Sequence, residues 1–164
     1  MTEQANNRNS YRVLRDNIIA AFPQSVFSGA ITGVDGRTDE ELDEEQALYN
    51  ALHGRKWSDI EGSFVSSYPD GISLLTDQAF AAFLPAWLVA ALDNDNVREL
   101  LVYFFSPSTH QTSERRERRI QQLTLPQKKV LQAFLGYCFE VEASEFVKEH
   151  ARSAVEYAAR FVGD

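Results

Sequence analysis

Residues 75–92, LTDQAFAAFLPAWLVAAL, contain the most apolar run of this 164-residue sequence and decide its fold class. Thr76 is a suitable helix N-cap, and the residues that follow it are apolar on almost every face of a helix. A helix without a polar face must be covered on all sides, so we predict a buried central helix over 76–92. Pro85 lies inside this segment and has no amide proton to donate to the Ala81 carbonyl, which predicts a kink.

Helical patterns recur along most of the remaining sequence. Apolar residues at spacing three and four predict helices over 10–22, 38–53, 97–105, 124–141 and 145–162, and a basic helix is expected over 114–122. Ser10 is expected to cap the first helix and Pro23 to end it, with residues 1–9 flexible. An extended piece around 25–31 and a turn at 68–71 are too short to change the class. We therefore predict an all-α fold: one compact single-domain bundle, residues 1–164, of six to eight helices.

The composition is that of an ordinary globular protein, with 44% hydrophobic and 24% charged residues. The net charge of −8 repels nucleic-acid phosphates, so we expect no nucleic-acid partner. The single cysteine, Cys138, lies in an apolar run and is expected to be buried. The N-terminal residues are polar and the longest apolar run is too short to cross a bilayer. We therefore expect a cytoplasmic location and no membrane association.

Acidic residues are concentrated between Asp35 and Glu45. Carboxylates in the first turn of a helix are stabilised by the positive end of the helix dipole, so a solvated helix explains them. The alternative is a docking patch that attracts a basic protein surface. The candidate partner-binding residues are Asp39, Glu40, Glu41, Asp43, Glu44 and Glu45.

A basic segment, 114–119, reads ERRERR. Glu114 and Arg118 are four positions apart in the favourable order, which predicts a surface helix whose charges largely neutralise one another. Alternatively, the arginines pair with the acidic helix of the same chain, or contact a phosphate or an acidic partner. RNA binding would favour aromatic residues between the basic ones, and this segment contains none.

No pattern in the sequence indicates a catalytic or metal site. The three histidines form no metal-binding pair, and residues 93–98, DNDNVR, lack the oxygen ligand and the glycine that a calcium loop needs after its first acids. Nucleophile elbows and glycine-rich phosphate loops are also missing. We therefore expect no catalytic residues, no metal and no cofactor.

Residues 75–88 resemble the signature of a family of bacterial proteins of unknown function, which reads roughly LTPEAFRYYLPAFL. Similarity extends over about 45–140 and includes Trp57 and the later Gln127-Lys128 and Phe134-Leu135 pairs. Asp77-Gln78 replaces Pro-Glu, and Ala81-Ala82-Phe83 replaces Arg-Tyr-Tyr. The resemblance implies a shared fold and no particular reaction.

Size, acidity and the lack of catalytic motifs favour a non-enzymatic binding protein. Its most concrete form is an immunity or antitoxin-type protein that neutralises a bacterial effector by direct binding. Two alternatives remain: a hydrolase built on scattered carboxylates, and a structural or regulatory module that forms a homodimer.

Overall fold

The computed structural model describes residues 2–33, 43–107 and 113–163. Within these ranges the chain forms eight α-helices and two short 3-10 helices. Thr32 and Leu75 form an isolated antiparallel β-bridge that is not part of a sheet. The all-α class is therefore confirmed. The chain divides into two compact units, Met1–Phe22 with Arg98–Asp164 (unit 1) and Pro23–Val97 (unit 2).

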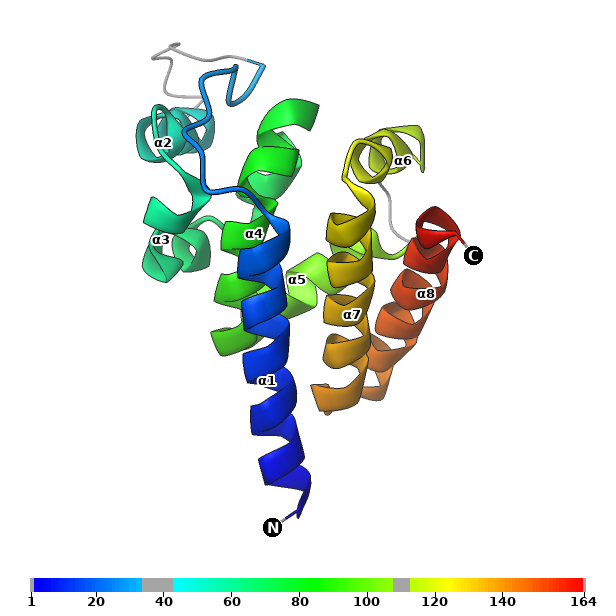
Figure 1. Cartoon of the computed structure of the whole chain (residues 1–164). Coiled ribbons are helices and arrows are strands. Elements are labelled where there is room, and N and C mark those ends of the chain that lie inside the picture. Colours follow the sequence, from blue (N-terminus) through cyan, green and yellow to red (C-terminus); the bar gives the residue numbers. More distant parts are fainter. Residues whose placement is uncertain (1, 34–42, 108–112, 164) are drawn as a thin grey trace. The chain divides into compact units, whose positions relative to one another are not determined.

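Unit 2 is built around the helix that the opening stretch predicts. Helix α4 spans Asp77–Asp93, and eleven of its residues are buried, including Phe80, Trp87 and Pro85. The elements α2 (Asp43–Leu52), η2 (Trp57–Asp59), α3 (Gly62–Ser67) and η3 (Pro69–Leu74) complete the unit, and η2, α3 and η3 contact α4 (Figure 1). Pro85 lies within α4 as expected, and the kink stays a prediction.

Thr76 connects the start of α4 to a segment more than forty residues earlier. Its hydroxyl accepts a hydrogen bond from the Ala79 amide at 3.1 Å, which makes it the N-cap. The same hydroxyl donates to the Ala30 carbonyl at 2.7 Å, and the Thr76 amide donates to the Ile31 carbonyl at 2.9 Å. The predicted cap is confirmed, and it also fixes the irregular segment before α2.

Side-chain hydrogen bonds also fix the C-terminal half of α4. Trp87 is fully buried, and its indole Nε1 donates to the Pro69 carbonyl at 3.0 Å, which joins α4 to η3. Asn94 ends α4; its side-chain oxygen accepts from the Val97 amide at 3.0 Å, and its amide donates to Ser66 at 3.1 Å. One residue thus separates α4 from α5 (Asp95–Phe105), where the sequence predicts a break of four.

Helix α2 and the segment after it bear out two sequence expectations. Leu48 and Leu52 are buried, and Gly54 follows the helix with a φ of 69°, the left-handed conformation that suits glycine at a helix end. The large ring of Trp57 predicts a core residue, and its exposed fraction of 6% confirms this. The turn predicted at 68–71 is present, closed by the Gly71 amide donating to the Tyr68 carbonyl at 3.0 Å, and it continues as η3.

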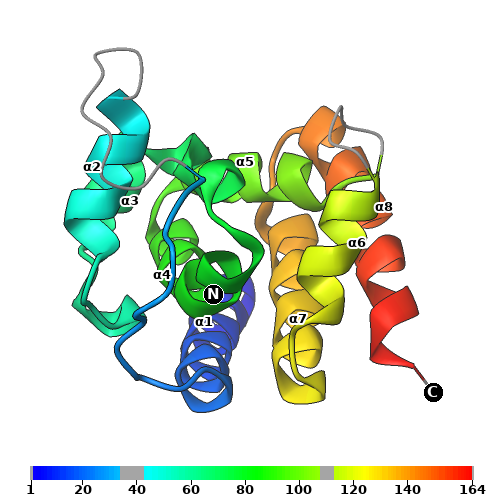
Figure 2. The same cartoon turned by 90° about the horizontal axis from the view of Figure 1, so that it is seen from above.

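Unit 1 is a set of helices with α7 in the middle. Helix α7 (Leu125–Val141) packs against both α1 (Thr2–Ala21) and α8 (Glu145–Val162), and α6 (Ser113–Gln121) precedes it (Figures 1 and 2). The sequence Thr124-Leu125-Pro126-Gln127 predicts a capping box at the start of α7, and the structure confirms it, with Thr124 and Gln127 bonded in both directions. Gln127 also donates to the Ala21 carbonyl at 3.2 Å, so the start of α7 meets the end of α1.

The start of the first helix differs from the prediction. Helix α1 begins at Thr2, so Ser10 lies in its middle and is not its N-cap. Once Leu14, Ile18 and Phe22 are buried, extending the helix toward its N-terminus adds one hydrogen bond per residue and needs no new nucleus. Glu3, Gln4 and Ala5 are also good helix formers. The flexibility expected for 1–9 is a separate property and stays a prediction.

Replacing Thr76 by Val should lower the free energy of unfolding by about 1–2 kcal/mol, because the isosteric side chain loses both hydroxyl bonds. Thr76→Ser, which keeps the hydroxyl, should cost less than half as much. Urea denaturation followed by circular dichroism measures both changes. Equal losses in the two variants would contradict the capping role.

Candidate functional site

The predicted acidic residues fall partly within the described chain. Asp39, Glu40 and Glu41 lie outside the described residues. Asp43, Glu44 and Glu45 form the first turn of α2; Asp43 is exposed, and the other two are half-buried. Carboxylates at this end of a helix are stabilised by its dipole, as the sequence indicates.

A fourth carboxylate joins them from another element. Burial raises the pKa of Glu44 above its ordinary value of 4.5, and the charges of Asp70, in η3, and of Glu45 raise it further. We call Asp43, Glu44, Glu45 and Asp70 the acidic cluster. None of its carboxylates forms a salt bridge with a residue in the described ranges. Because like charges lie together there, the cluster is poised to attract a cation.

The structure overturns the surface-helix interpretation of the basic segment at two positions. Arg116 and Arg119 are each 1% exposed, although the helix that carries them, α6, is highly charged. Arg116 Nε donates to the Phe104 carbonyl at 3.2 Å, at the end of α5, and its guanidinium lies 5.6 Å from the centre of the Tyr157 ring. The Arg119 guanidinium lies 5.7 Å from the centre of the Phe104 ring.

These arginines therefore hold α5, α6 and α8 together. A guanidinium near the carbonyl end of a helix also interacts favourably with its dipole. The sequence signal for this burial is spacing: Arg116 and Arg119 share a face of α6 with Ile120, which is buried, and Leu123, just after the helix, is buried as well. Arginines at apolar positions of a helix pack their stems inward.

Among the described residues, the single cysteine and Ser106, which lies next to His150, are both buried. Cys138 is 1% exposed, as predicted, and burial raises its pKa far above the ordinary value although Arg98 opposes this effect. Ser106 Oγ lies 3.2 Å from His150 Nδ1, but Ser106 is fully buried and so cannot meet a substrate. Within the described ranges, no group of three or more His, Cys, Asp or Glu side chains could hold a metal ion. His110 lies outside those ranges.

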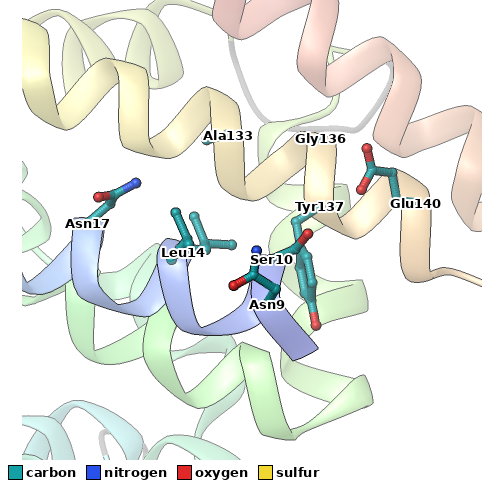
Figure 3. A pocket seen from close by; sticks show the side chains of 9 residues that line it. Asn9, Ser10, Leu14, Asn17, Ala133, Gly136, Tyr137 and Glu140 are labelled. Carbon is teal, nitrogen blue, oxygen red and sulfur yellow. The ribbon is translucent and has the colours of Figure 1, made fainter. Parts of the chain in front are cut away.

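Two open hollows lie along α1 and α7 in unit 1. The first, which we call the α1–α7 hollow, has a volume of about 380 Å³ (Figure 3). Its lining residues are Asn9, Ser10, Val13, Leu14, Asn17, Ala133, Gly136, Tyr137 and Glu140. The second, which we call the arginine hollow, has a volume of about 400 Å³. Its lining residues are Asn7, Arg8, Tyr11, Arg12 and Tyr137.

Tyr137 lines both hollows, and Figure 3 shows its side chain reaching from α7 toward the first turns of α1. Each volume is in the range of small-molecule sites. The sequence did not point to this place, because it needs two helices that are more than one hundred residues apart in the chain. The only sequence signal is Gly136 in the middle of a helix, where glycine is unfavourable.

The comparisons with known proteins concern most of the chain. A model for a family of unknown function, DUF6714, matches residues 32–160. This range includes the 45–140 stretch over which the sequence resembles a family without an assigned activity. No curated protein and no solved structure matches the chain. None of the described helices is long and apolar enough to cross a membrane.

Replacing Glu44 by Gln should stabilise the protein at pH 7 and have little effect near pH 4. A carboxyl whose pKa is raised on folding binds its proton more tightly in the folded state, so its contribution to stability falls as pH rises from 4.5 through the raised value. The glutamine amide does not ionise, so the Glu44→Gln variant does not lose stability in this way as pH rises. Thermal unfolding of both proteins between pH 4 and pH 7 measures the difference, and a gain that does not depend on pH would contradict the assignment.

Replacing Gly136 by Ala should raise the free energy of unfolding by roughly 0.5–1 kcal/mol. A Cβ atom added there meets nothing within 4 Å, so the helix gains a better helix former without a clash. Gly71→Ala is the contrasting control, because its Cβ would lie 2.8 Å from Leu48 Cδ2 and should destabilise the protein. Calorimetry measures both changes; a loss of stability in Gly136→Ala would contradict the open space at this position.

Proposed function

The chain belongs to DUF6714, a family of unknown function, and we propose that it is a non-enzymatic binding protein that recognises a basic protein surface. The observation that carries this proposal is the position of Glu44, next to Asp70 and Glu45 on two packed elements. Folding holds these like charges together at a cost in free energy. A cationic partner would remove that cost, since its charges stabilise the ionised carboxylates.

The net charge of −8 supports the same partner chemistry. A protein of negative net charge with a local acidic cluster attracts a basic surface before contact, which raises the rate of association. We place the protein in the cytoplasm of a bacterium, as an immunity or antitoxin-type protein that covers the active surface of a toxic effector. The product of the adjacent gene is the first partner to test.

The test is binding of the purified chain to the adjacent gene product, measured by biolayer interferometry at low and high salt. The variant Asp43→Lys, Glu44→Lys, Glu45→Lys should slow association by about tenfold at low salt, and the difference should shrink at 0.5 M NaCl. Dissociation should change less, because steering acts on the encounter.

A matched control separates the cluster from net charge. The variant Glu3→Lys, Asp16→Lys, Glu156→Lys changes the total charge by the same amount at exposed positions of unit 1. Equal slowing in the two variants would mean that net charge alone matters and would contradict the docking role. The failure of the neighbouring gene product to form a complex would overturn the immunity or antitoxin-type form of the proposal.

A further inference from the structure

The arginine hollow brings two cationic side chains together in a protein of net charge −8. Arg8 and Arg12 lie one helical turn apart on α1, on the same side of the helix. Both are exposed, and neither forms a salt bridge with a residue in the described ranges. Two guanidinium groups at this spacing can bind one phosphate through paired hydrogen bonds, because each group presents a planar fork of donors.

Two aromatic residues and an amide complete this hollow. Tyr11 and Tyr137 line it beside the two arginines, and Asn7 is the remaining lining residue. A planar ring in the ligand, such as a nucleobase, could stack on a tyrosine ring there. A bare inorganic anion would use the arginines and leave the rings without a role.

The α1–α7 hollow provides the other half of a site. It begins at Tyr137 and presents an apolar wall at Val13, which is 51% exposed, beside amide and hydroxyl groups from α1. Glu140, from α7, adds a carboxylate that can accept hydrogen bonds from sugar hydroxyls (Figure 3). Gly136 has no side chain, and a Cβ atom added there would meet nothing within 4 Å. The space that a side chain would fill is therefore part of the hollow.

We propose that the two hollows together bind a nucleoside 5′-monophosphate. The phosphate lies between Arg8 and Arg12, and the nucleoside lies along Tyr137 toward Val13. A single nucleotide fits the charges better than a nucleic acid, because the net charge of −8 repels a long row of phosphates. This site is independent of the acidic cluster in unit 2.

The test is isothermal titration calorimetry of the full chain with AMP, GMP, CMP and UMP. At least one of them should bind about tenfold more tightly than its unphosphorylated nucleoside and than inorganic phosphate. The variant Arg8→Gln, Arg12→Gln should weaken this binding by about tenfold or more. Arg15→Gln, an exposed arginine of the same helix outside both hollows, should leave it unchanged.

A second variant tests the nucleoside half. Gly136→Leu places a side chain in the α1–α7 hollow, so it should abolish nucleotide binding while thermal unfolding shows a folded protein. The proposal is overturned by the lack of binding of all four nucleotides at about 5 mM. It is also overturned if inorganic phosphate binds as tightly as the nucleotides, or if Arg15→Gln weakens binding as much as the double variant. If a single-stranded oligonucleotide binds more tightly than any mononucleotide, the proposal is wrong and the site binds a nucleic acid.

Discussion

The fold of unit 2 depends on the burial of α4, a helix that has no polar face. Each large apolar side chain that it removes from water stabilises the protein by roughly 1.5–3 kcal/mol, so the neighbouring elements are needed as cover. Polar groups then fix where that cover lies. Thr76 ties the start of α4 to Ala30 and Ile31, and Trp87 ties its middle to Pro69. Burial provides the driving force, and these few hydrogen bonds select the arrangement.

Charged residues in this protein lie in two kinds of environment, buried and accessible. Arg116 and Arg119 are buried against backbone and aromatic rings, where they hold helices together and no ligand can reach them. The acidic cluster and the Arg8–Arg12 pair remain accessible and make no salt bridge with a residue in the described ranges. Only the accessible groups can recognise a partner, because a side chain that is 1% exposed is out of reach of another molecule.

The accessible charges have opposite signs and lie in different units. The acidic cluster belongs to unit 2, and the arginine hollow belongs to unit 1. Their chemistry differs as well: the acidic cluster lies at the surface of a helix turn and suits a protein surface, whereas the arginine hollow is concave and lined by rings, which suits a small ligand. Recognition of a partner protein and binding of a small anion are therefore compatible in one chain.

The sequence alone determined the elements whose causes are local. It determined the all-α class, the Thr76 and Thr124 caps, the end of α2 near Gly54 and the burial of Trp57 and Cys138, because helix periodicity and capping act within a few residues. It misplaced the start of α1, since helix extension follows from the packed residues rather than from a cap. Only the tertiary structure decided that Arg116 and Arg119 are buried and that the Asp70 carboxylate lies near that of Glu44. It also decided that residues of α1 and α7 line two open hollows. Each of these brings together residues from separate helices, and the pattern along one helix does not state which other helix will cover it.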